Sequence, residues 1–424
     1  MIGIVGAGIT GLSLSIHLEE QGIEHRVFEA STRPGGVIRS ERREGRVLDF
    51  GPQRTRVTPP VGRMVEKLGL SGRSVSVPVD LPLYVLRGGR IRRVPFKLSD
   101  LLATDLLSLK GKLRLLLEPW TSGYGHDETV GAFLVRKFGV EAYENLMGPL
   151  FGGLYGSDPG RMYVRHSLAE TMEGFGVQRS ILWGFLRGSF NRSAAPPAVS
   201  FIDGMQELTD AMHRRVEHRV SLGSAVESVE ASGEDGWVVS LAGGERVEVR
   251  DLVLTVPAEG AALLLEGVAP DAAARLAALA YNRLAVVHLL GDCELHGLGY
   301  QVAYGEPRRT RGVTWNASAL GRDGVYTAFL GGARDPELLQ LDDPEIGAIA
   351  SREFEAVTGC STRVLRVSRT RVPSWDRSWT AMEELELPPH LHLCSNYESR
   401  VGIPGRLART EALAAELAGS APSS

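Results

Sequence analysis

Residues 2–11 read Ile-Gly-Ile-Val-Gly-Ala-Gly-Ile-Thr-Gly, and this stretch predicts a nucleotide-binding fold. The first four residues predict a short buried strand, and the apolar residues after Gly11 predict a helix. Between strand and helix stands the pattern G-x-G-x-x-G. Gly6 permits a tight turn, Gly8 lets the backbone approach a pyrophosphate, and Gly11 lets the helix pack closely on the strand. The amino terminus of the helix then offers free N–H groups to the phosphates.

The residues downstream indicate which dinucleotide is bound. A second predicted strand ends at Glu29, a carboxylate at the distance from the glycines that suits ribose hydroxyls. Residues 33–40 follow with the pattern R-x-G-G-x-x-x-S. Gly35 and Gly36 let a loop lie against the ribityl-phosphate side of a flavin, and Arg33 can neutralise phosphate. Nicotinamide-binding folds do not need this loop, so we predict FAD.

Composition narrows the class of protein. The chain has 424 residues, 43% of them hydrophobic and 23% charged, with a net charge of −4. This length predicts two or three structural units with real cores, and the charge excludes a strongly basic nucleic-acid binder and an acidic disordered chain. The three cysteines, Cys293, Cys360 and Cys394, are odd in number and widely spaced. They predict neither a disulfide framework nor a zinc site, and a reducing compartment fits best.

Hydropathy argues against secretion and membrane insertion. A strand-like run from Ile2 leaves no room for a signal peptide. No stretch of the sequence approaches the roughly 18 apolar residues of a spanning helix. The richest apolar region, Leu101 to Leu117, is interrupted by charged residues. We therefore expect a cytoplasmic protein.

The periodicity changes several times along the chain. Helical patterns with glycine-rich breaks run from about residue 97 to 195, and a Pro-rich boundary follows at 194–197. Strand patterns then occur at 226–230, 237–241, 251–256, within 283–335 and at 391–393, and an Ala-rich helix begins at Arg409. This order predicts an α/β protein whose nucleotide domain is assembled from the start, middle and end of the chain.

Further segments carry a family resemblance. The segment from Gly6 to Ser40 resembles the FAD-binding start of the flavin amine oxidase superfamily. Other segments narrow the resemblance to the protoporphyrinogen and coproporphyrinogen oxidases; these are residues 127–136, 153–158, 179–184, 201–208, 254–258 and 396–404. The similarity covers nearly the whole chain.

The resemblance implies a fold and a reaction. Such enzymes remove hydrogens from a reduced tetrapyrrole and pass the electrons to oxygen, in haem biosynthesis. It implies noncovalent FAD, with Val226 near the adenine and a carboxy-terminal flavin loop that contains Asn396, Gly402 and Ile403. A flavin accepts the hydride itself, so we expect no titratable catalytic residue and no metal site. His390 and His392 point to one face of a strand and are expected to be surface or satisfied core residues.

The resemblance also implies domain limits. It places a Rossmann-like FAD-binding domain at 1–78 with 198–262 and 385–420, a mixed-sheet substrate domain at 79–85 with 263–384, and a helical insertion at 86–197. The insertion covers the substrate channel and can rest on the inner face of a membrane. The stretch from Leu101 to Leu117 fits such peripheral contact. A buried helix of the channel wall is the alternative, and we favour it.

A porphyrinogen carries propionates, which need a cation or donor near the pocket. The family often has an arginine where this chain has Gln53, and Arg54 and Arg56 follow. Leu81 replaces a second family arginine, and Arg92 and Arg93 are other substitutes. Residues that sandwich the macrocycle in the family correspond to Leu298, Phe329 and the polar Gln301. The alternatives are solvated arginines and plain core residues.

The carboxy-terminal loop departs most from the family. Small family residues are replaced by Ser395, Arg400 and the pair Arg409-Thr410, although Thr410 can cap a helix. These changes keep two alternatives open. One is a flavin amine oxidase or desaturase that acts on another, specialised metabolite, and the other is a non-catalytic relative. Covalent flavin at Cys394 is not expected. The sequence does not give the preferred porphyrinogen, the electron acceptor or the oligomeric state.

Overall fold

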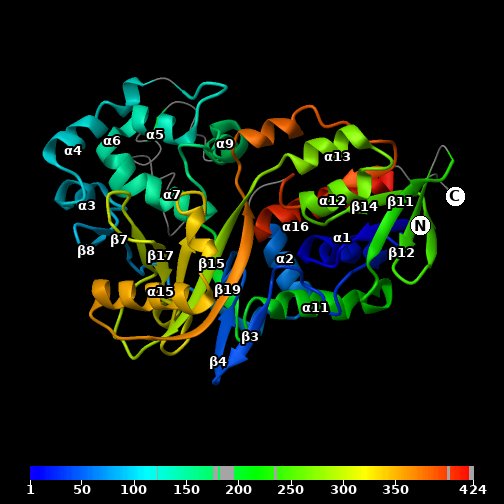
Figure 1. Ribbon diagram of the computed structural model, residues 1–424, viewed down its shortest axis with the longest axis horizontal. Helices are drawn as coiled ribbons and strands as arrows, with labels where there is room; N and C mark the ends of the chain where they lie inside the picture. Colours follow the sequence, from blue (N-terminus) through cyan, green and yellow to red (C-terminus); the bar gives the residue numbers. More distant parts are fainter. Residues whose placement is uncertain (122, 175–179, 182–194, 234–235, 399–401, 420–424) are drawn as a thin grey trace.

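The structure is a computed structural model that describes residues 1–121, 123–174, 180–181, 195–233, 236–398 and 402–419. Figure 1 shows a nucleotide-binding half that holds both chain termini at one end of the molecule. The insertion helices and a large sheet lie at the other end. This arrangement confirms the predicted α/β fold, with a parallel and a mixed sheet.

The nucleotide-binding half is built on a five-stranded parallel sheet. Its strands, in spatial order, are β10 (Val220–Ser221), β2 (His25–Phe28), β1 (Ile2–Val5), β14 (Asp251–Leu254) and β20 (Leu391–Leu393). The central strands β1 and β14 are buried along their whole length, as in parallel sheets that are covered on both faces. Helices α1 (Ile9–Glu20), α11 (Gln206–Val216) and α16 (Ile403–Gly419) pack together in this half.

Smaller elements surround this sheet. A three-stranded antiparallel sheet contains β11 (Val226–Ala231), β12 (Trp237–Leu241) and β13 (Arg246–Val249), with α12 (Ala258–Leu265) and α13 (Pro270–Ala277) nearby in sequence. A ribbon contains β3 (Ser40–Arg43) and β4 (Arg46–Asp49), and a third small sheet contains β5 (Thr55–Arg56), β9 (Ala198–Phe201) and β6 (Ser74–Ser76). Helix α2 (Pro59–Lys67) contacts α16.

The second large sheet is mixed and seven-stranded. Its strands, in spatial order, are β19 (Arg363–Pro373), β15 (Tyr281–Leu290), β18 (Val325–Gly331), β17 (Thr310–Thr314), β16 (Gly299–Val302), β7 (Leu83–Arg87) and β8 (Arg90–Arg93). The pair β16–β7 is parallel and the other pairs are antiparallel. Helix α15 (Asp343–Thr358) packs on one face. Because β7 and β8 carry the sheet as far as Arg93, the insertion's helices begin after the expected boundary at residue 86.

The insertion helices lie on the other side of this sheet from α15. They are α3 (Leu98–Ala103), α4 (Leu109–Leu115), α5 (Val130–Phe138), α6 (Val140–Ala142), α7 (Gly148–Tyr155), α8 (Val164–Ser167) and α9 (Ala169–Gly174). Among these helices, α7 is the one that packs on the strands of the sheet. Helix α7 approaches the sheet so closely that a Cβ on Gly148 would lie 2.6 Å from the ring of Tyr304. A Cβ on Gly153 would lie 2.2 Å from Oε1 of Gln301. Glycine at these two positions is therefore a packing requirement.

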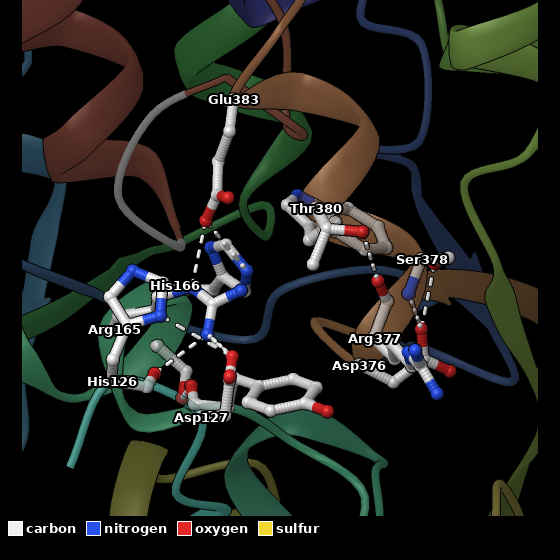
Figure 2. A network of polar contacts seen from close by, with 12 residues as sticks. His126, Asp127, Arg165, His166, Asp376, Arg377, Ser378, Thr380 and Glu383 are labelled. Carbon is white, nitrogen blue, oxygen red and sulfur yellow. Dashed lines mark hydrogen bonds and ion pairs between the residues drawn. The ribbon is translucent and has the colours of Figure 1, made fainter.

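A polar network joins the insertion to the segment that follows β19 (Figure 2). The Arg165 guanidinium donates to the carboxylates of Asp127, at 2.6 Å, and Glu383, at 2.7 Å. A 3₁₀ helix, η6 (Arg377–Met382), begins in the same segment, and the Asp376 carboxylate caps it. Since Glu383 lies far from Arg165 in the sequence, this contact joins α8 to the segment that follows β19.

The structure corrects the cysteine prediction. Cys293 and Cys360 form a disulfide, and Cys394 is a buried free thiol. Cys293 lies in the loop after β15 and Cys360 directly after α15, two elements that pack together. Sequence spacing could not reveal this proximity, and the inference of a reducing compartment loses that support.

The structure supports the favoured interpretation of residues 101–117 as a buried wall only in part. Leu106 and Leu115 are buried, whereas Leu109 is 75% exposed and Leu113 57%. Trp120, just beyond this stretch, is 78% exposed. Leu109 and Leu113 are four residues apart, so they lie on one face of α4. Within the described part of the chain, every helix is too short or too polar to cross a lipid bilayer.

Candidate functional site

The predicted glycine turn has the geometry that its sequence implies. Gly6 has a φ of +104°, a conformation that disfavours a side chain. A Cβ on Gly11 would lie 1.9 Å from the carbonyl oxygen of Gly6, so helix α1 is in direct contact with the turn. Gly8 differs, because no atom lies within 4 Å of the Cβ that it lacks. The space above Gly8 is thus open.

The amino terminus of α1 faces this turn without a side-chain cap. Gly8 is the N-cap residue and supplies no capping hydrogen bond. The first N–H groups of a helix have no partner within it, and they favour negative charge. An open, uncapped helix start beside glycines fits a dinucleotide pyrophosphate.

The second glycine pair lies against this turn. Gly35 has a φ of +99° and donates its N–H to the Ala7 carbonyl at 2.8 Å. A Cβ on Gly36 would lie 3.3 Å from the Cα of Gly8. The loop that the sequence assigned to FAD therefore borders the open space above Gly8. Arg33 donates to the carbonyls of Pro34 and Gly36, so its guanidinium is held on its own loop.

Glu29 lies at the end of β2, next to the glycine turn. Its Oε2 accepts a hydrogen bond from the N–H of Ala7 at 2.7 Å, and Oε1 accepts from the N–H of Ser31 at 2.9 Å. These bonds orient the carboxylate where an adjacent ribose is expected. Val226, the residue assigned to the adenine, is partly buried at the start of β11.

The carboxy-terminal loop brings Asn396 and Ile403 into the same half of the molecule. Asn396 accepts a hydrogen bond from the Tyr281 hydroxyl at 3.1 Å. Helix α16 begins at Ile403, earlier than the predicted start at Arg409, because Pro404 is compatible with a first helical turn. Gly402 precedes it with a φ of +89°.

The family departures in this loop have structural roles. Thr410 does not cap a helix; its hydroxyl lies 2.9 Å from that of Ser13 on α1, and both are buried. Arg409 donates to Glu398 at 2.9 Å. Burial raises the pKa of the Cys394 thiol to about 12. Arg400 lies outside the described residues, and so does most of the predicted segment 179–184.

The arginines expected near the substrate have different surroundings. Gln53 is buried, and its Nε2 has no hydrogen-bond partner among the described residues. Arg54 is partly buried. Arg56 is exposed and donates to the Pro196 carbonyl, which matches the solvated alternative. Arg92 pairs with Asp105, so it is also engaged elsewhere.

Two of the three macrocycle positions share one row of the mixed sheet. Gly312 on β17 pairs with Gln301 on β16 and with Phe329 on β18. Directly paired residues of neighbouring strands lie on one face. This is the face beneath α7, because the Gln301 amide abuts Gly153. Leu298 lies elsewhere, against a small apolar cluster that includes Leu81.

A buried polar network that no sequence pattern predicts organises the loop 50–54. Asp49 ends β4, and its carboxylate accepts from Arg322, from the Ser40 hydroxyl and from the N–H of Met205. The Asp49 carbonyl faces Nε2 of His288 at 3.0 Å. These partners are distant in sequence, so no local motif could have linked them.

The two histidines of the last strand, His390 and His392, share one acidic partner. His390 and His392 both contact Oδ1 of Asp251, at 2.9 and 3.4 Å. These contacts, together with Arg250, hold the pKa of the Asp251 carboxyl well below its usual range although burial opposes them. Among the described residues, no group of three or more acidic, His or Cys side chains could hold a metal.

Comparisons with known proteins place this geometry in a family. The family model described as flavin containing amine oxidoreductase matches residues 9–389. The chain is 28% identical to the chloroplastic protoporphyrinogen oxidase of Nicotiana tabacum over 83% of this chain and 71% of that protein. It is 25% identical to the coproporphyrinogen III oxidase of Bacillus subtilis over 84% of this chain and 82% of that protein.

A solved structure supports the same conclusion for the fold. A crystal structure from Exiguobacterium sp. 255-15 superposes with a TM-score of 0.82 and 19% identity, over 99% of each chain. The family is flavin-containing, which implies FAD, and the open glycine turn of this chain fits that cofactor. The chain belongs to the flavin-containing amine oxidoreductase family, with distant homologues among the porphyrinogen oxidases.

Proposed function

We propose that the protein is an FAD-dependent oxidase that dehydrogenates a porphyrinogen, protoporphyrinogen IX or coproporphyrinogen III, to the porphyrin with oxygen as acceptor, in haem biosynthesis. The observation that carries this proposal is the similarity to two named porphyrinogen oxidases over more than four fifths of the chain. We assign substrate binding to the mixed sheet and the helices of the insertion, which form the other end of the molecule in Figure 1.

The proposed cofactor site consists of the glycine turn, the loop that borders it and the carboxy-terminal loop. We assign the following residues to FAD: Gly6, Gly8, Gly11, Glu29, Arg33, Gly35, Gly36, Val226, Asn396, Gly402 and Ile403. When bound, FAD supplies the hydride acceptor. The chain contributes binding and orientation, through the N–H groups of α1 and the Glu29 carboxylate.

The FAD is proposed to be noncovalent. Cys394, the cysteine of the carboxy-terminal segment, is buried and its raised pKa keeps it a neutral thiol. The thiolate is the reactive form of cysteine, so this thiol is a poor nucleophile. Flavin that leaves the protein on denaturation supports the proposal, and flavin that stays attached contradicts it.

The proposed substrate pocket lies on the insertion-covered face of the mixed sheet. Gln301 and Phe329 share a row there. The resemblance adds Leu298, which packs against the separate cluster with Leu81, and the loop with Gln53 and Arg54. Arg56 remains in the proposal, although its exposure argues against direct contact. These residues would exclude water from the pocket and orient the macrocycle.

The decisive experiment is an anaerobic titration of the flavoprotein with each porphyrinogen. We expect the oxidised flavin's visible absorbance to bleach, and porphyrin fluorescence to appear when air is readmitted. Flavin that neither porphyrinogen bleaches would shift the assignment to the alternative, an amine oxidase or desaturase of the same family that acts on another metabolite. The polar Gln301 in the pocket row is the observation that favours this alternative.

We also propose that the insertion rests on the inner face of a membrane and that the protein is otherwise cytoplasmic. Helix α4 and the residues after it expose a set of large apolar side chains beside the exposed Lys110; they are Leu109, Leu113, Leu116, Leu117 and Trp120. An apolar helix face with lysine nearby is suited to a bilayer with anionic lipids.

A further inference from the structure

The seam between α7 and the mixed sheet contains two arginines whose hydrogen-bonding capacity is unused. Arg311 lies on β17, next to Gly312 of the pocket row, and Arg334 lies in the loop after β18. Neither guanidinium makes a hydrogen bond to the residues that the structure describes. Arg311 reaches Asp335 only at 3.8 Å, and Arg334 reaches Asp158 only at 3.7 Å.

The nearby carboxylates are already engaged by other groups. Arg309 donates two hydrogen bonds to Asp335, both at 2.8 Å. The Glu353 carboxylate accepts the backbone N–H groups of Arg309 and Thr310, at 3.0 and 2.9 Å. The Asp158 carboxylate likewise accepts the N–H of Gly160 at 3.0 Å. The two aspartates therefore do not saturate Arg311 and Arg334, and donors of these two arginines remain for another anion.

Burial of one donor makes this arrangement costly without a ligand. Nε of Arg311 is buried and has no partner among the described residues. Burial lowers the pKa of Arg311, and the positive charge of Arg334 lowers it further. An unpaired buried donor costs about 1–3 kcal/mol, and more when it is charged. An anion that bridges both guanidinium groups would relieve this cost.

Tyr304 holds the second arginine in place. The Arg334 guanidinium lies 3.6 Å from the centroid of the Tyr304 ring, which orients its edge by a cation–π contact. Burial raises the pKa of the Tyr304 hydroxyl, so it stays protonated and able to donate. Gly152 leaves room for this hydroxyl, because a Cβ there would lie 3.0 Å from it.

We propose that Arg311 and Arg334, with Tyr304, form a carboxylate-binding site under α7. Planar guanidinium groups match the two oxygens of a carboxylate and can bind it in bidentate fashion. Both side chains are 29% exposed, so a ligand can reach them. The assignment of the carboxylate to a substrate propionate rests on the proposed function; the site itself does not.

The first test compares Michaelis constants. Arg311→Met and Arg334→Met should each raise the KM for coproporphyrinogen roughly tenfold, as the loss of one charge-assisted contact predicts, with kcat and the flavin spectrum nearly unchanged. Arg311→Lys should recover part of the effect, because it keeps the charge and loses the planar fork. Arg366→Met, an exposed arginine on β19 of the same sheet, is the matched control and should leave KM unchanged.

The second test needs no turnover. Adipate should raise the melting temperature of the wild-type holoenzyme above its value in sodium chloride of equal ionic strength. In the double variant, which combines Arg311→Met with Arg334→Met, adipate should have no such effect. A wild type that oxidises neither porphyrinogen but shows this adipate effect would refute the proposed function and retain the site. Unchanged KM together with an unchanged adipate effect in the double variant would overturn the site.

Discussion

The Asp49 carboxylate and the Arg322 guanidinium form a buried ion pair across 273 residues of sequence. Arg322 lies just before β18 of the mixed sheet, and Asp49 lies at the end of β4, directly before the loop that leads to Gln53. Arg322 also donates to the Ser200 hydroxyl at 2.9 Å. One side chain thus ties the mixed sheet to both the β3–β4 ribbon and β9.

Removing one partner of this pair should be strongly destabilising. Asp49→Asn or Arg322→Met leaves an uncompensated buried charge or donor, and we expect a loss of about 3–5 kcal/mol in the free energy of unfolding. Urea unfolding at neutral pH measures it. Arg371→Met, which breaks the exposed pair with Glu259, should cost below about 1 kcal/mol. Equal losses at the two pairs would contradict the role of burial.

Substitutions at two glycines of the turn should have different effects, one on FAD binding and one on folding. Gly8→Val adds a side chain to open space, so the protein should fold and lose FAD. Gly11→Val collides with the Gly6 carbonyl and should destabilise the fold itself. Flavin absorbance and far-UV circular dichroism separate the two outcomes. Stoichiometric FAD in folded Gly8→Val would refute the assignment of the pyrophosphate to this turn.

The disulfide should contribute a measurable part of the stability. Cys293 and Cys360 are separated by 67 residues, and closing a loop of that size is worth about 4 kcal/mol in the chain-entropy model. The double change to Ser should lower the urea midpoint by a corresponding amount, and reductant should destabilise the wild type alone. Three titratable thiols in the denatured, unreduced protein would show that the bond does not form.

Stability should fall as His288 becomes protonated in the unfolded chain. Burial lowers its pKa from 6.5 to about 4, with Arg322 contributing and Asp49 opposing. The folded state therefore favours neutral His288, so its full contribution is present above pH 6.5 and declines as the pH falls toward 4. By linkage the loss is roughly 2 kcal/mol at pH 5.

His288→Gln is the variant that tests this assignment. Its amide can still donate to the Asp49 carbonyl, but it does not titrate. The difference in unfolding free energy between pH 7 and pH 5 should be smaller by roughly that amount in the variant. An identical pH dependence in both proteins would assign the loss to other groups.

The exposed apolar side chains of α4 and of the short helix that follows it should determine whether the protein binds membranes. Leu113→Glu with Trp120→Glu should abolish cosedimentation with vesicles of phosphatidylcholine and phosphatidylglycerol, because both side chains are more than half exposed. Leu263→Glu changes an equally exposed leucine on α12 and should have no effect. Wild type that stays in the supernatant would exclude this contact.

Local patterns were sufficient for the cofactor half of the molecule. The predicted strands 2–5, 25–28, 237–241 and 391–393 match the structure, and 251–256 ends two residues early, at Leu254. Each is a run of apolar or alternating residues bounded by turns, so neighbours in sequence determine it. The glycine spacing likewise predicted the turn, because the close approach of Gly11 to the Gly6 carbonyl is a local contact.

The sequence by itself therefore determined the fold class, the cofactor turn and the family. Only the tertiary structure decided the Cys293–Cys360 disulfide and the burial of Asp49 with Arg322. The exposed face of α4 and the proximity of Arg311 to Arg334 also depended on it. Each of these depends on which distant segments pack together. Long-range packing sets burial, and burial sets the energies of charges and thiols, so no local pattern can encode them.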